Sequence, residues 1–317
     1  MPKRKANHPP LLARHAKRRS LGPLRNLRIS SLALRRYQEH ASYFFYWINA
    51  LGANACLSSE QELDVWIQEY VEQLWDHNAG LEAAQATLAG VQHFLKNTVR
   101  LKGAWKLLSV WRRHEPPSRA APMPEHIVLA LAMQALQAGD APFCASLLLG
   151  FYGFLRTGEI ISLTCAQCIF DASDHLVLYL GQCKAGKRKG EEEYAIIDHP
   201  AVCSLLRIFL AGRHPLQAVC QCDEFGWRRK FDFHLQNLGL VALSFRPYSL
   251  RRGGATCALR RGQTPAIICT RGRWANERTA RMYIQEAVSL LQKLTVTPEV
   301  HASLIALATL WGFNFLR

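Results

Sequence analysis

Four prolines fall within the eleven residues 114–124 and divide the chain into two parts. Proline has no backbone N–H, and its ring obstructs the preceding helical turn, so no helix can run through this segment. In a chain of 317 residues each side is long enough for an ordinary domain. Hydrophobic residues make up 49% of the chain, which excludes global disorder. The sequence therefore predicts two folded domains joined by a linker at 114–124.

The part before the linker, residues 29–113, has the residue spacing of amphipathic helices. Ser59 followed by Glu62 is the pattern of a capping box, which predicts the start of a helix. The apolar stripe expected for that helix is Leu63, Trp66, Ile67, Tyr70, Val71 and Leu74. A similar stripe at 37–51 predicts an earlier helix, and two more are expected at 81–97 and 102–113. Together they predict a four-helix domain.

The part after the linker, residues 125–288, mixes helices with a short sheet. Helices are expected at 125–138 and 142–156. Alternation at Leu176–Leu180 and the β-rich run Tyr194–Ile197 predict strands on either side of a basic turn at 181–190. The expected fold class is mainly α with a small antiparallel β-sheet (α+β). The apolar tail at 289–317 is expected either to dock on a neighbouring protomer or to cover its own core.

The charge balance points to a polyanionic partner. The net charge is +15, from 39 Lys and Arg against 24 Asp and Glu. Residues 1–28 carry nine basic residues and no acid, which predicts a disordered arm that contacts DNA, serves as a nuclear address, or does both. Nine arginines and only Glu277 occur in residues 246–281, and arginine without compensating acids is typical of phosphate contact. Double-stranded DNA is the expected partner, and a basic protein without nucleic-acid function is the alternative.

Cysteine usage and hydropathy bear on the compartment and on metal binding. There are ten cysteines, and no apolar core follows the basic N-terminus as it would in a signal peptide. Reduced thiols and an intracellular location, nuclear in a eukaryotic host, are therefore expected. The pairs Cys165/Cys168 and Cys220/Cys222 raise zinc as an alternative, but they lack regular ligand spacing, so no metal is expected. The apolar stretches are too short or too interrupted to span a bilayer, so no membrane contact is expected.

A set of polar residues in the second part can carry out phosphoryl-transfer chemistry. Arginine donates two parallel hydrogen bonds to a phosphate, and a tyrosine phenol can attack and later leave. Together with a lysine and a hydrogen-bonding indole, these groups can break and rejoin a DNA phosphodiester without metal. The residues, in chain order, are Arg156, Lys184, Tyr248, Arg251, Trp274 and Tyr283.

The order and spacing of these residues resemble the tyrosine recombinase/integrase family over about residues 36–286. Gly153–Ile160 is similar to the Arg-x-x-Glu segment of that family. Pro247–Thr256 is similar to its His-x-x-Arg box, except that Tyr248 stands where His is usual. Gly272–Ile284 is similar to the segment in which a His or Trp precedes the nucleophile by nine residues, here Trp274 and Tyr283.

The resemblance implies a role for each residue. Tyr283 would be the nucleophile, and Arg156 and Arg251 would bind the scissile phosphate. Lys184 would protonate the leaving 5′-oxygen, with Lys187 and Lys189 as close competitors in the same turn. Trp274 would donate its indole N–H, and Tyr248 would hydrogen-bond where the usual His also exchanges a proton. Further DNA contacts are expected from Arg246, Arg252, Lys187, Lys189 and Arg273.

The resemblance also implies the overall activity. The expected protein is a site-specific DNA recombinase or mobile-element integrase that forms a 3′-phosphotyrosyl intermediate. Residues 29–113 would be its DNA-clamping, core-binding domain of SAM-like type, and residues 125–288 its catalytic domain. No cofactor is expected, since the phosphotyrosyl bond conserves the energy of the phosphodiester, and a homo-tetramer on DNA is expected because two duplexes are exchanged. The alternatives are DNA relaxation of type IB topoisomerase kind and a catalytically impaired DNA-binding remnant.

Overall fold

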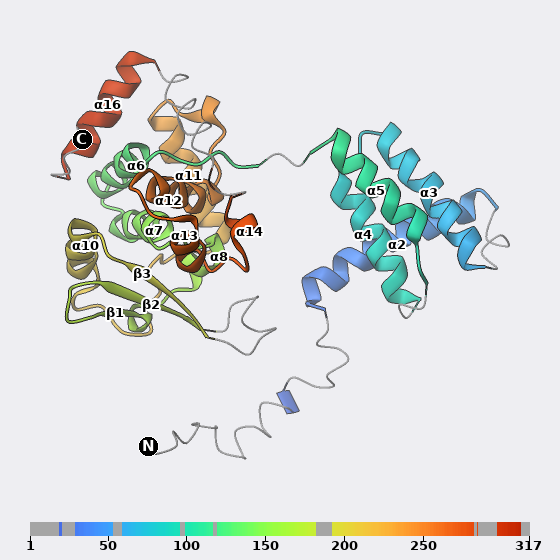
Figure 1. Cartoon of the computed structure of the whole chain (residues 1–317), viewed down its shortest axis with the longest axis horizontal. Coiled ribbons are helices and arrows are strands. Elements are labelled where there is room, and N and C mark those ends of the chain that lie inside the picture. The colour runs from blue at the N-terminus through green and yellow to red at the C-terminus, as the bar shows by residue number, and fades with distance from the viewer. Residues whose placement is uncertain are drawn as a thin grey trace. The chain divides into compact units, whose positions relative to one another are not determined.

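The computed structural model describes residues 19–20, 29–52, 59–95, 99–116, 119–181, 192–281, 284 and 297–311 (Figure 1). The chain divides into two compact units, Met1–Ser118 and Arg119–Arg317. The boundary lies inside the proline-rich segment 114–124, where proline interrupts helical hydrogen bonding. The predictions for residues 1–18 and 21–28 of the arm fall outside the described residues.

The first unit is built from α2 (Ser31–Ala50), α3 (Glu60–Asp76), α4 (Leu81–Phe94) and α5 (Lys102–His114). The capping box predicted at the start of α3 is present, with Ser59 and Glu62 each accepting the other's backbone N–H. The helices bury one continuous cluster that includes Phe44, Ile67 and Leu108. The four-helix pattern predicted for this unit is therefore confirmed.

Close approach of α2 and α4 depends on a glycine. A Cβ placed on Gly90 would lie 2.5 Å from the carbonyl oxygen of Tyr37. Only a residue without a side chain allows the two helix backbones to meet at that distance. The pair α2 and α4 forms one side of the unit, while α3 packs mainly against α5.

In the second unit a small sheet lies at one edge of a group of helices, as Figure 1 shows. Strands β1 (Cys168–Phe170), β2 (Leu176–Gly181) and β3 (Glu193–Ile197) form an antiparallel sheet in that order. The helices of this unit are α6 (Glu125–Gln137), α7 (Ala141–Tyr152), α8 (Thr157–Ser162), α10 (Pro200–Leu210), α11 (Glu224–Asn237), α12 (Tyr248–Arg260), α13 (Pro265–Arg271), α14 (Glu277–Arg281) and α16 (Pro298–Thr309), with short 3₁₀ turns at Cys165–Gln167 and Val241–Leu243. The expected class, mainly α with a small antiparallel sheet, is confirmed.

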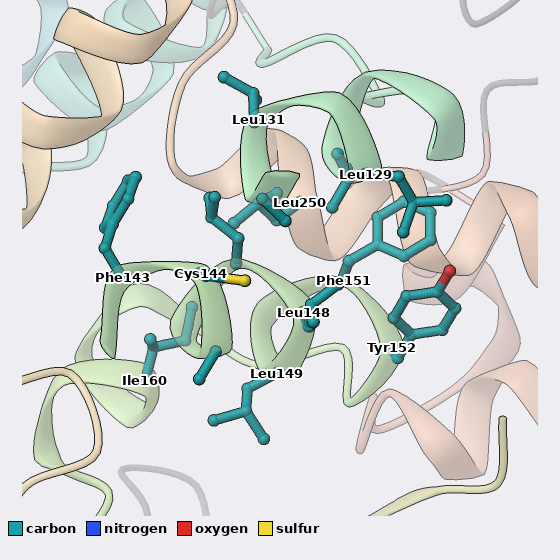
Figure 2. Packing of buried hydrophobic residues seen from close by; sticks show 14 of the residues in the cluster. Leu129, Leu131, Phe143, Cys144, Leu148, Leu149, Phe151, Tyr152, Ile160 and Leu250 are labelled. Atoms are coloured by element: carbon teal, nitrogen blue, oxygen red, sulfur yellow. The ribbon is translucent and has the colours of Figure 1, made fainter. Parts of the chain in front are cut away.

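Helix α7 forms the centre of the second unit and is apolar all round. Figure 2 shows Phe143, Leu148 and Phe151 of this helix among side chains from its neighbours, including Leu250. A helix that is apolar on every face is one that must be covered on every face. Helices α6, α8, α10 and α12 all contact it. Residues that follow α7 are therefore held by a rigid core.

Helix α16 covers the core of its own unit. It packs on α6 and buries Leu304 and Ala308, and the indole N–H of Trp311 donates to the carbonyl oxygen of Leu129 at 2.9 Å. The described part of the tail therefore covers the core of its own unit, which is one of the two arrangements expected for it. Docking on a neighbouring protomer stays a prediction.

The described part of the chain was also searched for membrane spans and metal clusters. None of its helices is both long enough and apolar enough to cross a membrane. Nor do three or more His, Cys, Asp or Glu side chains within the described ranges gather as ligands for a metal ion. The Sγ atoms of Cys220 and Cys222 lie 3.3 Å apart, without such a third ligand.

Candidate active site

The turn that carries Arg156 begins where α7 ends. The sequence predicted a helix through residue 156, but α7 ends at Tyr152. Phe154 has a left-handed backbone with φ of 48°, and the N–H of Leu155 returns to the carbonyl oxygen of Gly150 at 3.1 Å. These are features of a Schellman motif, in which glycine usually takes the left-handed position. Arg156 is consequently extended, and it is the N-cap residue of α8.

Helix α13 ends in the same way. Arg273 has a left-handed backbone with φ of 54°, and the N–H of Trp274 donates to the carbonyl oxygen of Cys269 at 3.0 Å. The position held by Arg273 is again the one that glycine usually occupies. A residue with a side chain in this conformation costs about 1–3 kcal/mol, and such strain persists only where the surroundings maintain it. At this turn, the contacts of the Arg273 side chain maintain the strained conformation.

Arg251, on the first turn of α12, joins these two helix ends. It is 1% exposed, and its Nη1 and Nη2 donate to the carbonyl oxygens of Phe154 and Gly272. Carbonyl groups at a helix C-terminus carry partial negative charge, which favours a cation there. A guanidinium has five N–H groups, so three are left after these two bonds. Its Nε has no hydrogen-bond partner among the described residues.

The surroundings of Arg251 disfavour its charge. Burial, and then the nearby Arg273 and Arg156 guanidiniums, lower the pKa of Arg251 to about 10. Even so, the side chain stays protonated at neutral pH. A cation that is buried and repelled by two others is stabilised by any anion that enters.

Arg273 is tied to two carboxylates. Its Nη2 donates to Glu159 Oε2 at 2.6 Å, and its Nε lies 3.2 Å from Glu193 Oε2. Only 8% of the Arg273 side chain is exposed, against 10% for Glu159 and 13% for Glu193. Its Nη2 is also 3.4 Å from the carbonyl oxygen of Phe154, the acceptor for Arg251. These contacts hold the left-handed turn in place.

Glu159 also fixes Arg156. One of its oxygens accepts the backbone N–H of Arg156 at 2.8 Å, and the other lies 2.5 Å from Nη1 of the same residue. Burial by itself would raise the pKa of Glu159, but Arg273 and Arg156 outweigh it, so that the pKa is lowered. Glu159 is therefore an ionised group that orients two arginines.

Glu193 connects this cluster to the sheet. It is the first residue of β3 and pairs in register with Gly181 of β2, and its Oε2 is 3.7 Å from Arg156 Nη1. Lys184, Lys187 and Lys189 lie between these strands, outside the described residues. Glu193, close to Arg156, is thus where the described chain re-enters the sheet.

Trp274 and the flanks of Tyr283 belong to one apolar cluster. Trp274 is 9% exposed, stacks on Phe154 with ring centroids 6.5 Å apart, and has the Arg251 guanidinium over its ring at 4.8 Å. Tyr283 itself lies outside the described residues. Ala280 is buried in the cluster, and Ile284 packs against it.

The remaining predicted residues that the structure describes differ in how deeply they are buried. Tyr248 begins α12 half-buried, and it lies close enough to Arg251 for an ionised phenol to raise the pKa of that guanidinium. Arg246 is exposed, as a DNA contact would be. Arg252 is 3% exposed, so it is buried as Arg251 is, and a DNA contact by Arg252 stays a prediction. Arg273, also expected to contact DNA, is largely buried and pairs with Glu159 and Glu193.

The structure adds one residue that was not predicted from the sequence. Glu193 approaches both Arg156 and Arg273, yet in the sequence it is only the last of three acids after a basic loop. Its burial at the first position of β3 distinguishes it. Three guanidiniums and two carboxylates thus form the described cluster, which leaves one net positive charge for an anion.

Comparison with known proteins gave matches among solved structures alone. No model of a known protein family matches the chain, and no curated protein matches it. The crystal structure of XerA recombinase is similar over 86% of this chain and 96% of its own, with 13% identity and a TM-score of 0.42. The XerH site-specific recombinase, in its pre-cleavage complex with difH substrate, is similar over 76% of this chain and 71% of its own, with 11% identity and a TM-score of 0.48.

A third similar structure is the Tn1549 transposon integrase in complex with transposon right end DNA. It covers 74% of this chain and 85% of its own, with 10% identity and a TM-score of 0.47. These solved structures are recombinases and an integrase. They are of the same kind as the family that the sequence motifs resemble. With TM-scores below 0.5, the assignment of a function is left to this chain's own residues.

Proposed function

We propose that the chain is a tyrosine recombinase or integrase that cuts and rejoins DNA through a 3′-phosphotyrosyl intermediate. The observation that carries the proposal is the cluster of Arg156, Arg251 and Arg273 around Glu159 and Glu193. The cluster retains a net positive charge and has buried N–H donors beyond those bound to protein. Preformed donors of this kind stabilise the added negative charge of a phosphorane-like transition state.

In the proposed reaction, the phenol oxygen of Tyr283 attacks the phosphorus, and its proton passes to solvent water. The bond from phosphorus to the 5′-oxygen breaks, and that oxygen takes a proton from Lys184. A 3′-phosphotyrosyl link results. A 5′-hydroxyl from another strand then attacks the same phosphorus and releases the tyrosine, so the number of phosphodiester bonds is conserved. Two such exchanges on two duplexes require four copies of the chain on DNA.

The described side chains have distinct parts in this scheme. Arg156 and Arg251 bind the non-bridging oxygens of the phosphate, and Trp274 packs the guanidinium of Arg251. Glu159 and Glu193 touch no DNA and act as positioning residues for the arginines. Tyr248 hydrogen-bonds within the site, where its phenol exchanges protons poorly near pH 7 because its ordinary pKa is about 10.

The test is a covalent-trapping assay with nicked suicide duplexes made from the DNA that flanks the coding region. The parent chain is expected to form a protein–DNA adduct that survives denaturation. Tyr283→Phe is expected to form none and to bind the same duplex with unchanged affinity, because only the attacking oxygen is removed. An adduct formed by Tyr283→Phe would refute the assignment of the nucleophile.

One observation favours a second candidate, a DNA-binding remnant without catalysis. Tyr248 occupies the place of a proton-exchanging His. Under this alternative, the parent chain binds the suicide duplexes and gives no adduct in any of them. Relaxation of supercoiled plasmid without partner sites would instead indicate activity of topoisomerase kind.

A further inference from the structure

Charge is segregated between helices in the first unit. Helix α3 carries six Asp and Glu residues and no Lys or Arg, whereas α5 carries four Lys and Arg residues and no acid. In a chain of net charge +15, a helix whose charged residues are all acidic is unexpected. DNA phosphates are repelled by such a surface, so the acidic side of α3 has to face something other than DNA.

The acids in the first half of α3 already have partners. Asp64 accepts the backbone N–H groups of Gly103 and Ala104 at 2.7 and 3.0 Å, which fixes the start of α5. Glu62 completes the capping box. These carboxylates therefore serve the fold of the unit itself.

The acids in the second half of α3 have no such role. The side chains of Glu69, Glu72 and Asp76 make no hydrogen bond or ion pair with any described residue of the chain. Instead they line a groove of about 500 Å³ together with Trp47, Leu51, Trp66 and Gln73. Gln73 Oε1 is buried there and lacks a hydrogen-bond donor among the described residues.

The walls of the groove suit a basic side chain. Trp47 and Trp66 meet edge to face, with ring centroids 6.1 Å apart, and Leu51 is 55% exposed beside them. Indole faces attract Lys and Arg cations, and their aliphatic stems pack on apolar surface. Carboxylates at the rim would pair with the cationic heads. The groove therefore has the chemistry of a receptor for a Lys- and Arg-rich peptide.

We propose that the basic arm of this same chain, residues 1–28, binds this groove when DNA is absent, and that DNA displaces it. The arm has nine Lys and Arg residues and no acid, which complements the groove. It precedes α2, whose 20 residues extend about 30 Å toward Leu51. An extended arm of 28 residues spans about 90 Å, so it can return to the groove. Attachment also gives the arm a high effective concentration there.

The first experiment measures the arm as a separate peptide. A labelled peptide of residues 1–28 is titrated with the chain lacking those residues, and its fluorescence anisotropy is followed. Binding is expected, with a Kd that rises as salt is added. The triple variant Glu69→Gln, Glu72→Gln, Asp76→Asn is expected to bind the peptide at least tenfold more weakly. The control triple Glu39→Gln, Glu224→Gln, Asp232→Asn removes the same charge outside the groove and should bind like the parent.

The second experiment measures DNA binding by the full chain. Neutralising the groove frees the arm, so the groove triple should bind duplex DNA several-fold more tightly than the control triple. In the chain lacking residues 1–28 the two triples should bind DNA equally. Equal peptide binding by the two triples would overturn the proposal. So would a concentration-dependent dimer that disappears with the arm, because the arm would then occupy the groove of another copy.

The peptide experiment does not depend on catalysis. Loss of the covalent adduct would refute the proposed recombinase activity and leave the peptide result unaffected. Failure of peptide binding would refute the arm proposal and leave the adduct unaffected.

Discussion

Replacement of Arg273 tests how the arginine cluster is held together. The side chain is 8% exposed and pairs with two largely buried carboxylates. Removing one partner of a buried pair costs about 3–5 kcal/mol, because the remaining charges stay buried without compensation. Arg273→Ala keeps the strained left-handed backbone and is expected to lose this full amount of unfolding free energy. Arg273→Gly relieves the strain and should be about 1 kcal/mol more stable than the alanine variant.

The measurement is urea unfolding of the full chain, followed by circular dichroism in the far and near ultraviolet. Arg271→Ala is the matched control, because Arg271 lies in the right-handed helix α13 and pairs with Asp198, whose side chain is 48% exposed. An exposed pair contributes about 1 kcal/mol or less. If Arg273→Ala were no more destabilising than Arg271→Ala, the buried pairs would not maintain the site. If the glycine variant were no more stable than the alanine variant, the argument from backbone strain would fail.

Three further predictions address packing, pH and the unusual tyrosine. Gly254→Ala would place a Cβ 2.0 Å from the carbonyl oxygen of Phe151, so thermal unfolding should show a loss of about 1–3 kcal/mol of unfolding free energy. Gly158 has open space around it, so Gly158→Ala should be neutral or stabilising. The pKa of Glu159 is lowered in the folded chain, so the carboxylate stabilises the fold fully above pH 4.5. This stabilisation is lost as the pH falls through the pKa that Glu159 has in the folded chain. Glu159→Gln should therefore flatten the dependence of unfolding free energy on pH below 4.5. Tyr248→His should keep or raise the single-turnover cleavage rate, since His exchanges a proton near pH 7, and a tenfold loss would contradict the place given to Tyr248 in the site.

Local patterns in the sequence determined the helices and the main landmarks. The capping box at Ser59 and the apolar stripe of the following helix involve residues three or four apart, so a single helix satisfies them. The two domains followed from proline chemistry at 114–124. Arg156, Arg251 and Trp274 were chosen by motif spacing. The structure brings Arg251 and Trp274 together with Phe154, and Arg156 lies near enough to lower the pKa of Arg251. Lys184 and Tyr283 stay predictions.

Only the tertiary structure decided which arginines are buried and which of them pair with carboxylates. The sequence predicted that Arg252 and Arg273 contact DNA, and the fold buries both side chains. The partner of Arg273 is Glu159, 114 residues away, and no local pattern encodes a pair at that separation. The end of α7 at Tyr152 is likewise set by distant groups, because the left-handed turn at Phe154 presents its carbonyl to Arg251 and Arg273. Sequence determines what each segment can form alone, whereas buried charge requires partners that only the folded chain supplies.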